Sequence, residues 1–208
     1  MRIIADPGSC HMGDLSMAKE LIDVAREAGC SAIKFQLFKD LPPNIELPYK
    51  WMPELVEYGK GIEVFASVWD EDGVQALRGA GCRSIKFSYG QRGKAFLSMR
   101  GFTSIYVSGD VLHNFHPNHI RLYCIPEYPV PYQINFDCLF HGRFDGFSDH
   151  TLGCRQTMNA IRAGAKVIEK HIRLDHASND GVPDGKFALR PAELREMMNK
   201  IQYIHRLP

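Results

Sequence analysis

Three segments of this chain align with one another without gaps, and each reads as a helix end, a glycine stop and a buried strand. They cover residues 28–36, 80–88 and 163–171. A helix that leads through a glycine into a short apolar strand, repeated along one chain, is typical of proteins in which helices alternate with parallel strands. The repeat therefore restricts the chain to α/β architectures.

Each copy of the repeat ends in two polar residues that lie two positions apart. Side chains alternate between the two faces of a strand, so the members of each pair share a face. Polar pairs at the carboxyl ends of otherwise apolar strands indicate a shared site rather than a solvated sheet face. The pairs are Lys34 with Gln36, Lys86 with Ser88, and Glu169 with His171.

The rest of the chain supplies enough elements for a closed barrel. Further strands are predicted near residues 2–6, 62–67, 102–108, 119–124 and 143–148, and helical periodicity covers residues 15–28, 70–79, 151–163 and 191–204. Eight alternating units predict a compact (β/α)8 TIM barrel, an architecture whose lower size limit is about 200 residues. We expect one domain over residues 1–208 with very short loops, and the 109–117 connection hardly has room for a helix.

Composition narrows the class of partner. The chain is 45% hydrophobic, has a formal net charge of +1 and contains no basic run, so neither nucleic acid nor an anionic membrane is expected as a partner. No apolar segment is long enough for a signal peptide or a membrane span, which predicts a cytoplasmic location. The six cysteines form no Cys-x-x-Cys pair, so disulfides are not expected. Small molecules are the predicted ligands.

A second motif places two histidines at neighbouring strand ends. Ser148 and His150 share one face of a strand that ends in Gly-Phe-Ser-Asp-His-Thr, while Glu169 and His171 share a face of the next strand. Imidazoles that converge at the mouth of a parallel barrel suit a divalent metal with coordination positions left open for substrate and water. The sequence therefore predicts a metal site formed by His150 and His171.

A further set of motifs runs in order along most of the chain, at residues 4–15, 18–22, 28–36, 123–124, 128–131, 148–153, 168–171, 174–175, 183–184 and 189–194. This ordered set resembles the sialic acid synthase (N-acetylneuraminate synthase) family. The resemblance implies the barrel domain of that family, condensing phosphoenolpyruvate with the open-chain aldehyde of an amino sugar such as N-acetylmannosamine. The products would be a 2-keto acid sugar and phosphate.

The resemblance also implies roles for particular residues. His150 and His171 look like the ligands of a divalent cation, with Mn²⁺ favoured and Mg²⁺, Co²⁺ or Zn²⁺ compatible with the same donors. Lys34 and Lys86 resemble the family's lysines for phosphoenolpyruvate. The hydroxyl groups of three serines at strand ends complete the expected phosphate site: Ser88, Ser108 and Ser148. Five further residues match positions that face the sugar or its reacting carbonyl: Asp6, Gln36, Tyr128, Glu169 and Asp184.

Four departures from the family pattern bear on activity and sugar choice. Asp6 stands where the family has a glutamate, Cys10 replaces an asparagine, Gln91 replaces a carboxylate that could act as a base, and Gly185 replaces a histidine. The antifreeze-like domain of the family is not expected in this chain, and a separate polypeptide could supply it. A homodimer is possible on the same resemblance.

Other interpretations of these residues remain open. A lysine at a strand end commonly extends to solvent, Glu169 could orient a metal-bound histidine instead of contacting substrate, and Asp6 could simply end its strand. The alternative function is a catalytically degenerate barrel that binds a sugar phosphate or a metal without turnover. Isomerase or aldolase chemistry on the same metal site is a third, less favoured hypothesis.

Overall fold

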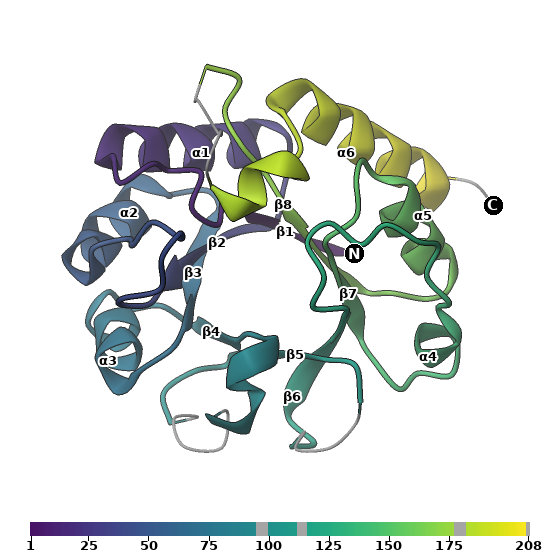
Figure 1. Ribbon diagram of the computed structural model, residues 1–208, viewed down its shortest axis with the longest axis horizontal. Helices are drawn as coiled ribbons and strands as arrows, with labels where there is room; N and C mark the ends of the chain where they lie inside the picture. Colours follow the sequence, from purple (N-terminus) through teal and green to yellow (C-terminus); the bar gives the residue numbers. More distant parts are fainter. Residues whose placement is uncertain (95–99, 112–115, 177–181, 207–208) are drawn as a thin grey trace.

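The computed structural model describes residues 1–94, 100–111, 116–176 and 182–206 and shows a closed barrel of parallel strands in the order β1 to β8 (Figure 1). This arrangement confirms the predicted (β/α)8 fold. The strands are β1 (Arg2–Asp6), β2 (Ala32–Leu37), β3 (Glu63–Val68), β4 (Ser84–Phe87), β5 (Ser104–Gly109), β6 (His119–Cys124), β7 (Gly146–Asp149) and β8 (Val167–His171).

Helices surround most of the barrel but not all of it. Within the described ranges, no α-helix lies between β4 and β5 or between β5 and β6, which agrees with the short 109–117 connection (Figure 1). The helices are α1 (Leu15–Glu27), α2 (Met52–Tyr58), α3 (Glu71–Gly79), α4 (Asp137–Phe140), α5 (Arg155–Arg162) and α6 (Pro191–Arg206), with 3-10 turns η1 (Tyr49–Trp51), η2 (Tyr89–Lys94) and η3 (Pro183–Lys186).

Several element boundaries differ from the sequence prediction. The helix expected from residue 151 begins only at Arg155, because Thr151 is still held in a parallel bridge to Val130 and Gly153 has a positive φ of 65°. Strands β5 and β7 begin two to three residues later than predicted, at Ser104 and Gly146. These differences fall at loop ends and leave the inward-facing residues unchanged.

The barrel interior is closed at its amino-terminal side by an apolar layer. Alternate residues along each strand face inward. The layer is a buried cluster of six side chains: Ile4, Ala32, Phe65, Tyr106, Leu122 and Val167. This layer fills the amino-terminal half of the barrel. The next inward-facing residues, two positions further along each strand, can therefore face only the carboxyl-terminal mouth.

Gly146 marks a point of close approach inside the sheet. A Cβ at this position would clash with the carbonyl oxygen of Val167 on the neighbouring strand, so only glycine fits there. The outer faces of the strands pack against the helices in a larger hydrophobic core, in which Leu21 of α1 and Phe35 of β2 are fully buried. Within the described residues, no helix combines the length and the apolar character needed to cross a membrane.

Candidate active site

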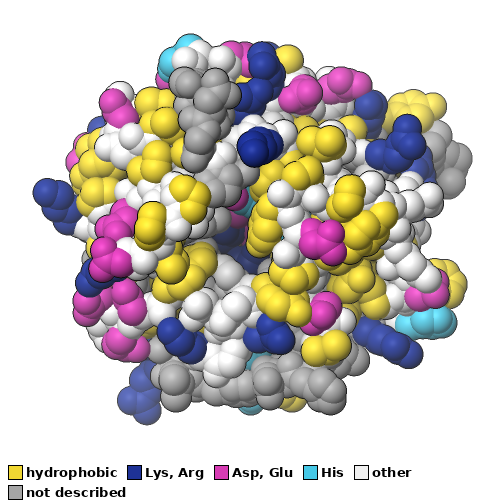
Figure 2. Space-filling model, in the orientation of Figure 1, with side chains coloured by type: hydrophobic (Ala, Val, Ile, Leu, Met, Phe, Trp, Pro, Cys, Tyr) yellow, Lys and Arg dark blue, Asp and Glu magenta, His cyan; other side chains and the backbone are white. Residues whose placement is uncertain are grey.

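The carboxyl-terminal mouth of the barrel opens into a cavity of about 270 Å³. In the space-filling view, basic and acidic side chains lie at the bottom of a central hollow whose surroundings are largely hydrophobic (Figure 2). Every residue that the sequence predicted for the site lines this cavity, although the role of each stays a prediction. These residues are Asp6, Lys34, Gln36, Lys86, Ser88, Ser108, Tyr128, Ser148, His150, Glu169, His171 and Asp184.

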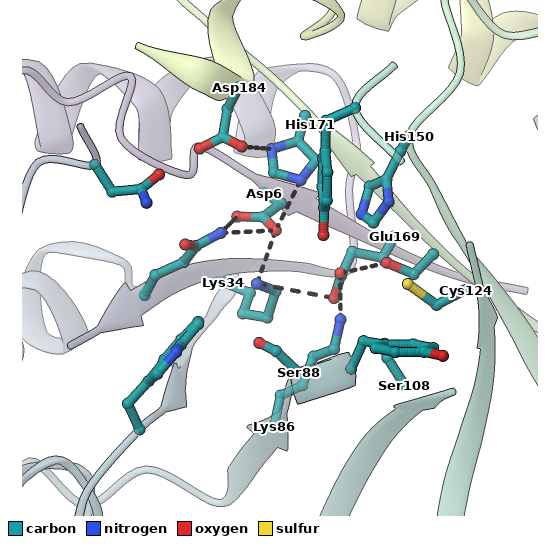
Figure 3. Close-up of a pocket in the computed structure, with 16 residues that line it drawn as sticks. Asp6, Lys34, Lys86, Ser88, Ser108, Cys124, His150, Glu169, His171 and Asp184 are labelled. Atoms are coloured by element: carbon teal, nitrogen blue, oxygen red, sulfur yellow. Dashed lines mark hydrogen bonds and ion pairs between the residues drawn. The ribbon is translucent and has the colours of Figure 1, made fainter. Parts of the chain in front are cut away.

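The bottom of the cavity holds a buried network of ion pairs (Figure 3). Lys34 Nζ lies 2.8 Å from Asp6 Oδ2 and 4.0 Å from Glu169 Oε2. Lys86 Nζ donates to Glu169 Oε1, which also accepts a hydrogen bond of 2.8 Å from Ser148 Oγ. The side chains of all four charged residues are at most 3% exposed. Strands from opposite sides of the barrel thus deliver their charges to one point.

Electrostatics keeps the two carboxyl groups ionised despite their burial. Burial acts to raise the pKa of Asp6, but His171, Lys34 and Lys86 together lower it below its ordinary value. Burial likewise opposes ionisation of Glu169, and the two lysines lower the pKa of this group overall. Lys34 shows the converse effect, because Asp6 and Glu169 outweigh burial and raise its pKa. Burial lowers the pKa of Lys86.

The two histidines lie side by side above this network (Figure 3), with ring centroids 5.6 Å apart. His150 Nδ1 is 2.9 Å from the carbonyl oxygen of Ile125. A carbonyl only accepts, so the proton sits on Nδ1 and Nε2 keeps its lone pair. Burial lowers the pKa of His150 to about 3, with a further contribution from His171, so the ring is neutral at pH 7. A neutral imidazole is the form that binds metals.

His171 stands between two carboxyl groups. Its Nε2 lies 3.4 Å from Asp6 Oδ2 and its Nδ1 lies 3.8 Å from Asp184 Oδ1, and Nδ1 has no hydrogen-bond partner among the described residues. Within those residues, no three His, Cys, Asp or Glu side chains form a group that could hold an ion by themselves. A cation bound by the two imidazoles would therefore need its other ligands from water or substrate.

The loop after β1 is fastened to η3 through Asp184. Ser9 N donates a hydrogen bond of 3.1 Å to Asp184 Oδ2, and Gly8 N donates one of 2.9 Å to Asp6 Oδ1. Gly8 has a φ of 52°, and a Cβ there would overlap the Asp184 carboxyl group. The glycine thus leaves room for the Asp184 carboxylate, which lies near Nδ1 of His171 while Asp6 lies near Nε2.

Four further lining residues were not predicted from the sequence: Asn44, Trp69, Tyr89 and Cys124. The first three belong to irregular segments or a 3-10 turn after strands, where side-chain direction does not follow from periodicity. Cys124 is different, because it ends β6 two residues after the inward-facing Leu122. Strand alternation alone could have identified it.

The departures from the family pattern do not all affect the cavity. Asp6 lines it, whereas Cys10, Gln91 and Gly185 are not among its lining residues. Cys10 is fully buried with Val182 and Ala188, and burial raises the pKa of its thiol to about 12. A buried thiol that stays protonated is a poor nucleophile. Gln91 lies in η2, so an effect of its missing carboxylate on the chemistry would have to be indirect.

Comparison with known proteins identifies the class as barrel enzymes that make sialic-acid-type sugars. The chain is 27% identical to the N,N'-diacetyllegionaminic acid synthase of Campylobacter jejuni, covering 98% of this chain and 76% of that protein. It is 28% identical to the human N-acetylneuraminate-9-phosphate synthase, covering 98% of this chain and 70% of that enzyme. The structure of a sialic acid synthetase from Leptospira borgpetersenii, in complex with citrate, superposes with a TM-score of 0.82 at 24% identity, covering 98% and 83% of the two chains.

Residues 99–207 match the model of the NeuB family. The chain therefore belongs to the NeuB family of sialic-acid-type synthases. The alignment with the Campylobacter enzyme extends over 256 positions, although this chain has 208 residues, so the relative carries insertions. That difference agrees with the short loops expected from the sequence.

Proposed function

We propose that this protein condenses phosphoenolpyruvate with the open-chain aldehyde of an amino sugar related to N-acetylmannosamine. In this reaction C3 of phosphoenolpyruvate bonds to the aldehyde carbon, water adds to C2, and phosphate leaves. One observation carries the proposal: two buried lysines and two histidines, which lie in or directly after four different strands, converge on a single cavity. Small molecules are thus the proposed substrates.

The two lysines form the proposed binding site for phosphoenolpyruvate. Lys34 and Lys86 are each paired with a carboxylate, so the phosphate and carboxylate of a substrate can compete for ammonium groups that are already desolvated. Ser108 Oγ is buried without a hydrogen-bond partner among the described residues, and such an orphaned group favours a polar ligand. Ser88 and Ser148 add hydroxyl groups to the same wall of the cavity.

The charge of the cavity bears on how an anion binds. The two lysines already face three carboxylates, those of Asp6, Glu169 and Asp184. Phosphoenolpyruvate would therefore compete with these carboxylates for the ammonium groups, and a cation that enters with the substrate would offset this competition. This balance supports a divalent cation, with Mn²⁺ favoured, as a part of the complete site.

His150 Nε2 and a ring nitrogen of His171 would hold that cation. The cation would polarise the aldehyde oxygen toward attack and orient a water. The hydrogen bond from His150 Nδ1 to Ile125 fixes the ring, and Tyr128 packs on it with centroids 4.2 Å apart. These contacts hold the donor atom in place before any ligand binds.

Glu169 is the proposed proton acceptor. Its Oε2 is buried and has no hydrogen-bond partner among the described residues, and the lowered pKa keeps it ionised. It can therefore take a proton from the water that adds to C2. Asp6 and Asp184 lie beside His171, Gln36 Nε2 lies 3.4 Å from Asp6 Oδ1, and Tyr128 packs on His150. These four residues are proposed to bind the aldose.

The test is phosphate release from phosphoenolpyruvate in the presence of Mn²⁺ and a series of amino sugars. We expect release that requires both the cation and an aldose, and its loss in the Lys34→Met variant. Lys39→Met is the matched control, because Lys39 pairs with Asp72 on the surface. If calorimetry shows phosphoenolpyruvate binding without turnover of any amino sugar, the degenerate binding barrel is the correct interpretation.

A further inference from the structure

A second buried ion pair lies directly behind the two histidines, outside the barrel interior. Asp149 and Lys170 each precede one of these histidines in the sequence and are paired in register on β7 and β8. Lys170 Nζ lies 3.3 Å from Asp149 Oδ2, and both side chains are completely buried. Neither residue lines the cavity, so neither touches a substrate held there.

This pair binds both backbone polar groups of Thr151, the residue that follows His150. Asp149 Oδ1 accepts hydrogen bonds of 2.7 Å from both the backbone nitrogen and the hydroxyl of Thr151. Lys170 Nζ donates to the carbonyl oxygen of the same threonine. Asp149 Oδ2 also accepts a hydrogen bond of 2.5 Å from Thr157 on α5. The end of β7 is therefore fastened to β8 and to a helix.

The stability of the fold does not by itself explain such a pair. Desolvation of two charges opposes their attraction, and buried ion pairs are often no more stabilising than apolar residues of similar size. What the pair does supply is a fixed geometry. The strands that carry His150 and His171 are joined behind the two rings by an interaction with defined distances and directions.

We propose that Asp149 and Lys170 are positioning residues that set the distance and orientation of His150 relative to His171 for binding a divalent cation. This inference rests on the proposed function of the two histidines. Without the pair, β7 would still be joined to β8 by the parallel strand pairing and by the hydrogen bond from Ser148 to Glu169. His150 itself would be held by the hydrogen bond of 3.1 Å from Val130 N to its carbonyl and by its ring contacts. Those contacts do not link Thr151, the residue after His150, to β8.

The experiment measures Mn²⁺ binding, by the loss of the free-ion electron paramagnetic resonance signal, together with the melting temperature. The variants are Asp149→Asn, Lys170→Met and the double variant. Each single change leaves a buried group without its partner, so we expect a lower melting temperature and at least tenfold weaker Mn²⁺ binding. In the double variant the melting temperature should recover while Mn²⁺ binding stays at least tenfold weaker.

Recovery of both properties in the double variant would show a merely structural role and overturn the inference. Unchanged Mn²⁺ binding in either single variant would do the same. Thr157→Val keeps both charges and removes one hydrogen bond to Asp149, so it serves if the single variants do not fold; we expect a smaller but measurable loss of Mn²⁺ affinity, and an unchanged affinity would contradict the proposal.

His150→Ala separates this inference from the proposed function. If that variant binds Mn²⁺ like the unmodified protein, the metal site itself is wrong and the positioning role falls with it. If His150→Ala loses Mn²⁺ while the Asp149 and Lys170 variants keep it, only the positioning role is wrong. Asp145→Asn is the matched control, because Asp145 pairs with Arg121 on the outer surface.

Discussion

Strands β2 and β6 belong to the same barrel but have opposite polarity. The outer face of β2, formed by Ile33, Phe35 and Leu37, is fully buried, and its inner face carries Lys34 and Gln36. In β6 the inner face is apolar except for its final thiol. Its outer face instead carries partly exposed Arg121 and Tyr123, and Arg121 Nε pairs with Asp145 Oδ2 at 2.9 Å.

The difference shows that the outer face of a strand is apolar where helices pack against it. Helices cover the outside of β2, whereas within the described residues no α-helix lies between β5 and β6 (Figure 1). The cavity nevertheless draws residues from both sides, because Lys86 and Ser108 of β4 and β5 are as deeply buried as Lys34. The position of a residue along the barrel axis, rather than the helix cover of its strand, determines whether it lines the cavity.

The largest predicted effect comes from the inner face of β2. Lys34→Met removes one partner of a buried pair with Asp6, which we expect to abolish phosphate release and to lower the free energy of unfolding by about 3–5 kcal/mol. Leu122→Met on the inner face of β6 is the matched change, with an expected loss below about 1.5 kcal/mol. Denaturant unfolding and the phosphate assay measure both. Equal losses for the two variants would contradict the polarity difference.

On the outer faces of the two strands, the loss of stability on truncating a side chain should follow how deeply that apolar side chain is buried. Phe35→Ala empties a fully buried position, and we expect it to destabilise the fold by about 3–5 kcal/mol. Tyr123→Ala on β6 removes a partly exposed ring and should have a clearly smaller effect. Urea unfolding of the two variants tests this. A larger effect for Tyr123 would mean that β6 is covered more fully than its exposure indicates.

Close approach beside β6 gives a third, intermediate effect. Gly146→Ala places a methyl group against the carbonyl oxygen of Val167, and we expect a loss of about 1–3 kcal/mol from overpacking. Gly90→Ala is the control, because a Cβ at that position meets no heavy atom within 4 Å. Thermal unfolding distinguishes the two. If Gly146→Ala is as stable as the control, strands β7 and β8 can separate more easily than their register indicates.

The ion pair on the outer face of β6 should have the smallest effect. Burial acts to raise the pKa of Asp145, but its hydrogen bonds and attraction to Arg121 lower it overall. A lowered folded-state pKa contributes stability above the unfolded value, about pH 4, and that contribution is lost as the pH falls through the folded value. Because the pair is partly exposed, Asp145→Asn should cost about 0–1 kcal/mol at pH 7. The difference should disappear in unfolding measured near pH 2, and a difference that grows on acidification would contradict this sign.

The strand pattern predicted the centre of the site well because one rule places every residue there. Alternation along parallel strands brings Lys34, Lys86 and Glu169 to the same depth, and the repeat marked all three. The rule says nothing about residues in irregular segments, which is why Trp69 and Asn44 were missed. Gln91, which the family resemblance rather than strand alternation singled out, lies in a 3-10 turn and is not among the residues that line the cavity.

The outward residues of the two histidine motifs were missed for a different reason. Asp149 and Lys170 face away from the cavity, and their significance depends on the register between β7 and β8 and on Thr157 of a following helix. No single segment contains that information. Pairing across strands and packing of a helix are tertiary facts, which a pattern in one segment does not encode.

The most direct test is anomalous diffraction from crystals grown with manganese and phosphoenolpyruvate. We predict one manganese peak within bonding distance of His150 Nε2 and a ring nitrogen of His171, with the phosphate beside Lys34 and Lys86. A manganese peak elsewhere, or a phosphate bound away from both lysines, would contradict the proposed site.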